Sequence, residues 1–117
     1  MLGLADTRKG VAVMHVQIVT FRLEGITEAE YRAGCEAETG VFNELPGLLG
    51  KIWIARPETN TYGAVYLWRD RDAYAQYVDG EVFQSILDDE SLAGVESADY
   101  EVLDDLTRAT QPGLTLV

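Results

Sequence analysis

Two side chains in this sequence could serve as a base in an apolar pocket, Glu38 and His15. Glu38 interrupts an apolar stripe that repeats at three- and four-residue spacing. The other members of that stripe are Tyr31, Cys35, Phe42 and Leu45. A carboxylate buried on such a stripe must be paired, hydrogen-bonded or neutral, and one held in this way can accept a proton from a substrate. His15 is the chain's only histidine and is the second candidate, because an imidazole exchanges protons near neutral pH.

Both candidates also have purely structural interpretations. Glu38 could lie at the margin of the stripe, or pair with Arg56 or Arg69. His15 could be a strand-end histidine bound to backbone or water. Cys35 is interpreted as a small core residue, not as a nucleophile.

Aromatic residues supply the candidate walls of a site. Trp53, Tyr66 and Trp68 suit either a core or the binding of a flat aromatic substrate, and these two roles are compatible. Tyr31 and Arg56 complete the predicted substrate contacts. One cysteine and one histidine cannot build a Cys/His metal cluster. The acidic pairs Asp88-Asp89 and Asp104-Asp105 are interpreted as solvated surface, so no metal site is predicted.

Composition bounds the class of protein. The chain has 117 residues and a formal net charge of -11, which describes one domain and disfavours nucleic acid as a partner. The longest stretch without charged residues, Gly10 to Phe21, is 12 residues and is too short to span a membrane. A single cysteine fits a reduced, cytoplasmic protein. Residues 1–13 are expected to form an N-terminal extension and residues 109–117 a C-terminal tail around a domain at 14–108.

Periodicity predicts six elements that position these residues. Strands are expected at Met14–Phe21, Leu48–Arg56, Tyr62–Arg69 and Ala98–Leu106. A helix is expected at Glu28–Leu45, because Thr27 and Glu30 have the spacing of a capping box. Asp70 should cap a second helix, which Gly80 interrupts before a short helical face at Val82–Leu87.

The order of these elements predicts a ferredoxin-like α+β fold, βαββαβ, with two main helices on one face of a four-stranded antiparallel sheet. Alternation gives the second strand two apolar faces: Ile52 and Ile54 point one way, Lys51 and Trp53 the other. Because helices can cover only one face, the other would remain in water in a monomer. The sequence therefore predicts a homodimer, without deciding which face meets the partner.

Several short segments form a recognisable pattern: Pro46-Gly47-Leu48, Lys51-Ile52-Trp53, Gly63-Ala64-Val65-Tyr66-Leu67-Trp68, Tyr74 and Tyr77. With these segments, the sequence from Met14 to about Arg108 resembles the dimeric α+β barrel proteins grouped with antibiotic-biosynthesis monooxygenases, and most resembles small bacterial monooxygenases of the YdhR type. Two departures from that pattern are Ala64, where a second glycine is usual, and Trp68, where Phe is frequent.

The resemblance implies a homodimeric barrel and oxygenation of a small phenolic, quinol or anthrone-like compound by O2 without a cofactor. The protein would bind the ring, promote deprotonation and exclude water. Related haem-degrading barrels use an Asn, His and Trp set, which the single histidine on the first strand does not reproduce. An isomerase or cyclase in the same barrel, and a ligand-binding dimer without catalysis, remain alternatives.

Overall fold

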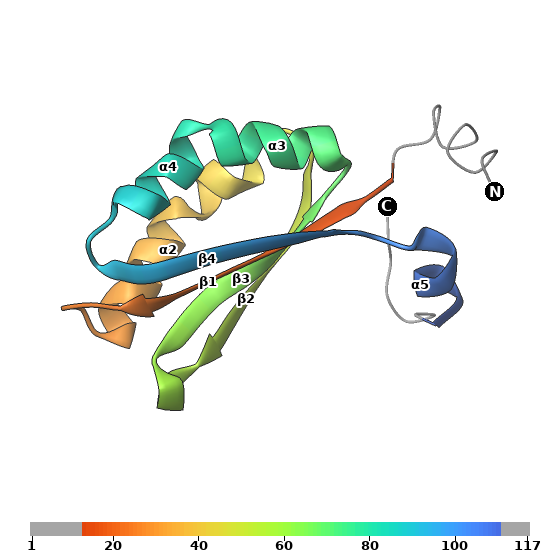
Figure 1. The fold of residues 1–117 in the computed structure, drawn as a ribbon. Helices are drawn as coiled ribbons and strands as arrows, with labels where there is room; N and C mark the ends of the chain where they lie inside the picture. The colour runs from red at the N-terminus through yellow and green to blue at the C-terminus, as the bar shows by residue number, and fades with distance from the viewer. Residues whose placement is uncertain (1–12, 111–117) are drawn as a thin grey trace.

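The computed structural model describes residues 13–110, which form a four-stranded antiparallel sheet in the order β2-β3-β1-β4. Three helices, α2, α3 and α4, cover one face of this sheet, and α5 projects beyond the end of β4 (Figure 1). The predicted ferredoxin-like fold is confirmed. The elements are β1 (His15–Leu23), α2 (Glu28–Asn43), β2 (Leu48–Arg56), β3 (Thr61–Trp68), α3 (Arg71–Asp79), α4 (Glu81–Asp88), β4 (Leu92–Glu101) and α5 (Asp104–Thr110).

Both predicted helix caps are present. Thr27 Oγ1 accepts from the Glu30 amide at 3.1 Å, and the Glu30 carboxylate accepts from the Thr27 amide at 2.8 Å. Asp70 accepts from the Ala73 amide at 2.8 Å, which holds the pKa of its carboxyl below the usual range. These caps begin α2 and α3 where the sequence places them, and Gly80 separates α3 from α4.

The two faces of the sheet differ in the side chains they carry and in whether helices cover them. The face under the helices carries the buried aromatic side chains Tyr62, Tyr66 and Trp68. On the opposite face, which we call the open face, Ile18 pairs with Val65 and Val65 with Ile52 across three strands. The larger apolar side chains of the open face are Val16, Ile18, Ile52, Ile54, Val65, Leu67 and Tyr100. Ile52 is 64% exposed and Tyr100 58%, so the described residues leave this aliphatic surface uncovered.

The C-terminal elements differ from the sequence prediction. The last strand was expected at Ala98–Leu106, but β4 begins at Leu92 and ends at Glu101, and α5 follows from Asp104. Pairing with β1 explains the earlier start, because Leu92 and Ala93 lie opposite Leu23 and Arg22. Alternation alone could not show this partner.

Three smaller points complete the comparison with the sequence. The helix predicted to reach Leu45 ends at Asn43. The predicted N-terminal extension, apart from Val13, and the tail beyond Thr110 lie outside the described residues. No helix in the described range is long and apolar enough to cross a membrane.

Candidate functional site

A cavity lies between α2 and the β2 edge of the sheet. Its outer part has a volume of about 270 Å³ and is lined by α2 from Glu28 to Thr39, by Trp53 to Ala55 on β2, and by Tyr62. An inner recess of about 50 Å³ continues toward the core, where Lys51 and Tyr66 join the lining. We call the two parts together the α2 cavity. Its parts share three lining side chains, Tyr31, Cys35 and Trp53.

Aromatic rings form much of the wall of the α2 cavity. Tyr31 packs edge-on against Tyr62 with ring centroids 5.3 Å apart, and Phe42 packs at 90° against Trp53 with centroids 5.8 Å apart. Trp53 is 42% exposed, so one side of its ring remains accessible. Edge-to-face packing of this kind fixes ring orientation and leaves flat walls for a planar ligand. The predicted wall residues Tyr31, Trp53 and Tyr66 are brought together here.

Lys51 reaches into this aromatic wall from β2. Its Nζ lies 3.0 Å from the centroid of the Phe42 ring, 3.6 Å from that of Trp53 and 4.7 Å from that of Tyr66. Burial lowers the pKa of Lys51 to about 7, although the nearby Cys35 and Glu38 act in the opposite direction. Among the described residues, no carboxylate forms an ion pair with this amine. Lys51 was not among the site residues predicted from the sequence. Its spacing of two residues from Trp53 on one strand nevertheless places both side chains on the same face of the sheet.

Glu38 occupies the margin of its helix stripe. Its side chain is exposed, which agrees with the alternative of a marginal position and not with that of a buried carboxylate, and it lines the inner recess together with Lys51. Arg69 does not pair with it and instead contacts Asp70, with Nε 3.3 Å from Oδ2. Arg56 is exposed at the end of β2 and lines neither part of the cavity. Cys35 is half-buried, and burial raises the pKa of its thiol, which agrees with a packing role.

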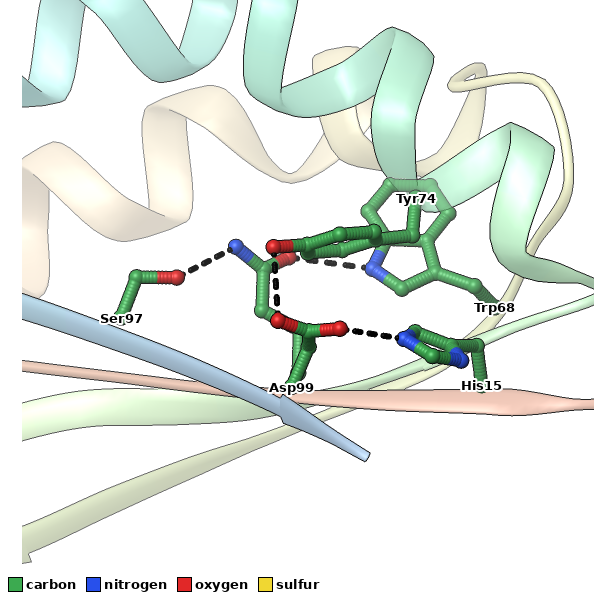
Figure 2. Close-up of polar contacts among 6 residues, drawn as sticks. His15, Trp68, Tyr74, Ser97 and Asp99 are labelled. Atoms are coloured by element: carbon green, nitrogen blue, oxygen red, sulfur yellow. Dashed lines mark hydrogen bonds and ion pairs between the residues drawn. The ribbon is translucent and has the colours of Figure 1, made fainter. Parts of the chain in front are cut away.

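His15 belongs to a different cluster, at the other edge of the sheet. Its ring is 5% exposed, and Nε2 lies 2.6 Å from Oδ2 of Asp99 on β4. The other oxygen of Asp99 accepts a hydrogen bond from the Tyr74 hydroxyl at 3.0 Å, and the Tyr74 ring lies 5.0 Å from that of His15 (Figure 2). The structure therefore does not bring His15 and Glu38 together. Sequence reasoning missed Asp99 and Tyr74 as partners, because nothing in their local spacing links them to His15.

Trp68 is fully buried behind Tyr66. The two rings are stacked with centroids 5.9 Å apart, and Trp68 Nε1 donates to Gln17 Oε1 at 3.0 Å. Gln17 Nε2 in turn donates to Ser97 Oγ at 3.0 Å, which satisfies the buried amide. Trp68 lines neither part of the α2 cavity. It supports Tyr66 from the side away from that cavity.

Haem is a candidate cofactor, because haem-degrading barrels are related to the proteins that the sequence resembles, so the question is whether the α2 cavity offers a ligand for its iron. Binding of haem iron requires a protein ligand directed into the pocket. The only histidine has its Nε2 turned to Asp99, and it lines neither part of the α2 cavity. Cys35 and Tyr31 do line it, but burial raises the pKa of each and disfavours the thiolate or phenolate that would bind iron. These residues therefore do not fit haem ligation there. Within residues 13–110, no three His, Cys, Asp or Glu side chains gather closely enough to hold a metal ion.

Solved structures confirm the fold. SnoaB, a cofactor-independent oxygenase from Streptomyces nogalater, has a TM-score of 0.63 at 18% identity, covering 78% of this chain and 94% of SnoaB. A protein of unknown function from Nitrosomonas europaea, NE2512, has a TM-score of 0.65 at 13% identity, covering 78% and 90%. A heme-degrading protein from Mycobacterium tuberculosis has a TM-score of 0.58 at 18% identity, covering 79% and 93%. At these identities the similarity establishes the fold alone.

The sequence itself matches one protein family. No curated protein matches it, but the family described as "Putative mono-oxygenase ydhR" matches residues 16–112. This match begins at the second residue of β1 and includes all later strands and helices that are described, with both sides of the α2 cavity. The chain therefore belongs to the ydhR family of monooxygenase-like proteins.

Proposed function

We propose that this protein is a monooxygenase that uses O2, without a bound cofactor, to oxygenate a small phenolic, quinol or anthrone-like compound. The observation that carries the proposal is the α2 cavity, whose walls are the rings of Tyr31, Trp53 and Tyr66 and whose recess holds ionisable side chains. Membership of a monooxygenase family supports the reaction type. The aromatic walls support the substrate class.

Such a substrate can itself supply the electrons. Deprotonation of a phenol gives an electron-rich anion that donates one electron to O2, and recombination of the two radicals forms a C–O bond. For an anthrone-like CH2 group, loss of water from the resulting hydroperoxide gives C=O. One oxygen atom of O2 then appears in the product and the other in water, and the substrate supplies all four electrons. The protein's task is to orient the ring, accept a proton and stabilise the anion.

Glu38 is the proposed base in this scheme. Its carboxylate lines the recess and is exposed, so a proton accepted from the substrate can pass to water. His15 remains the second candidate. It lies beside β4 and does not line the α2 cavity, so a substrate would have to reach the β4 side of the sheet to give it a proton. Trp68 and Arg56 remain proposed substrate contacts. Neither lines the α2 cavity, so a substrate would have to extend beyond it to touch them.

Oxygen uptake tests the proposed function. Purified protein, dialysed against chelator and free of flavin absorbance, is mixed with a panel of phenols, hydroquinones and anthrones in an oxygen electrode. We expect O2 uptake with one atom of isotopically labelled O2 in the product. Conversion of a panel compound without O2 uptake would indicate the isomerase or cyclase alternative. Binding of panel compounds without conversion would indicate a ligand-binding protein.

The proposed assembly is a homodimer joined through the open face. This face is continuous across the sheet, and Ile52, Ile54 and Tyr100 are exposed on it. Such a surface is typical of an interface rather than of a monomer. Its aliphatic residues, not the aromatic ones near Trp53, would meet the second copy.

Replacing Ile52 with Asp should separate the two subunits. The change places a charge on the open face, where burial against a partner would strip it of water. Light scattering should then report about 12.9 kDa rather than twice that mass. Ala37→Asp, which adds the same charge on an exposed position of α2, is the control and should leave the mass unchanged. A wild-type protein that is monomeric at all concentrations would contradict the assembly.

A further inference from the structure

The Lys51 amine is held in the wall of the α2 cavity without a negatively charged partner. Three rings surround its Nζ within 4.7 Å of their centroids, and no carboxylate among residues 13–110 lies within ion-pair distance. Removing an ammonium from water is costly unless an anion compensates it. Cation–π contacts supply part of that compensation, but each is worth only about 0.5–2 kcal/mol. When the amine carries its proton, the site therefore lacks a compensating negative charge.

We propose that Lys51 is an anion-binding catalytic residue that holds the ionised oxygen of a phenol or enol bound in the α2 cavity. This assignment rests on the proposed function for its substrate class, and it adds the group that recognises the reactive, charged form of that substrate. An ionised oxygen in the recess would supply the missing negative charge and accept a charge-assisted hydrogen bond from Nζ. The neutral ring would gain neither interaction.

The shape of the cavity is compatible with this arrangement. Tyr31, Cys35 and Trp53 line both the outer cavity and the recess, so a ring placed between them extends from the 270 Å³ part toward Lys51. Lys51 lines only the recess of these two parts. A planar substrate would therefore enter with its oxygen first and leave its other substituents in the outer cavity.

The other ionisable groups facing Lys51 do not replace the ligand. Cys35 and Glu38, both on α2, are near enough to act electrostatically on Lys51. Burial keeps the Cys35 thiol protonated, because it raises the pKa of that group. Tyr31 and Tyr66 are likewise held neutral, since burial raises the pKa of each phenol. Glu38 is exposed, so water screens its charge.

The probe for this site is para-nitrophenol, whose neutral and ionised forms absorb at different wavelengths. Its nitro group withdraws electrons and makes the ring resistant to reaction with O2, so binding is measured without turnover. Spectra of the bound probe are recorded over a pH series for wild type, Lys51→Met and Lys51→Arg. Arg22→Met is the control, because it removes an exposed cation on β1 that lines neither part of the α2 cavity.

We expect wild type to bind the ionised probe at least about tenfold more tightly than Lys51→Met does, which lowers the pKa of bound probe by about one unit relative to that variant. Lys51→Arg should keep most of this preference, and Arg22→Met should match wild type. Circular dichroism establishes that each variant is folded. Equal preference in wild type and Lys51→Met, or no binding of the probe to wild type, would overturn the assignment.

The result separates this assignment from the proposed function. Preferential binding of the ionised probe without O2 uptake on any substrate would retain the anion site and count against the monooxygenase. O2 uptake that is unchanged in Lys51→Met, together with no preference for the ionised probe, would retain the monooxygenase and overturn the role of Lys51.

Discussion

Turnover should fall by roughly 10²–10⁴-fold when Glu38 is replaced with Gln, because the amide keeps the shape of the side chain but cannot accept a proton. The substitution should leave stability nearly unchanged, since the carboxylate is exposed and makes no buried contact that the amide would lose. Oxygen uptake on the best substrate of the panel measures the first effect, and thermal unfolding measures the second.

Two comparison variants make this result specific. Glu44→Gln removes an exposed carboxylate just after α2 that lines neither part of the cavity, and it should retain wild-type turnover. His15→Ala tests the second candidate base, and its loss of the Asp99 contact should be seen as lower stability. Unchanged turnover in both Glu38→Gln and His15→Ala would eliminate both assignments of the base.

Removing the buried cation of Lys51 should change how stability depends on pH. The pKa of Lys51 is lowered to about 7 in the folded protein, from its ordinary value of 10.5. Below pH 7 both states carry the proton, so the cost of burying the charge is fully present. Between about pH 7 and 10.5 the unfolded chain keeps the proton that the folded chain has lost, so the free energy of unfolding should rise with pH. The Lys51→Met variant should lack this contribution.

Urea unfolding of both proteins from pH 7 to 9 measures the difference. The rise due to Lys51 has an upper limit of about 1.4 kcal/mol per pH unit, and partial exposure reduces it to roughly 1–2 kcal/mol over this range. The range stops at pH 9 because Tyr66, whose pKa is raised to about 12, and the other buried tyrosines add an opposite slope above pH 10. Equal protein concentration is needed if the chain is dimeric. Parallel curves for the two proteins would contradict a buried Lys51 charge.

Local chemistry made much of the fold predictable. The Thr27 and Glu30 pair and the Asp70 cap act within three residues, and the alternation in β2 and β3 needs only the sequence of each strand. The sheet face under the helices could not be chosen in advance, because both faces are apolar. The strand predicted through Leu106 failed at its end for a similar reason: alternation continues into α5, although pairing with β1 stops at Glu101.

The site was predictable in part. Tyr31, Trp53 and Tyr66 line one recess, because strand alternation and helix spacing direct them to one space. Trp68 and Arg56, predicted as contacts in the same group, line neither part of the cavity, and binding by any of the five stays a prediction. Lys51 was not selected, since a strand lysine is usually solvated and its burial depends on Phe42 of α2. The sequence could not decide whether Glu38 is buried or lies at the margin of its stripe, because the roll of α2 about its axis is set by packing against the sheet, which the helix sequence alone does not determine.

Successive side chains of β2 point to opposite faces of the sheet, so ligand binding and association with a partner could change independently in evolution. Lys51, Trp53 and Ala55 line the space under α2, whereas Ile52 lies on the exposed surface and lines neither part of the cavity. Substitutions at the first three can alter what is bound while the surface is preserved, and substitutions at Ile52 can alter association while the pocket is preserved. A relative could thus acquire a new ligand or a new partner by changes at alternate positions of the same nine residues.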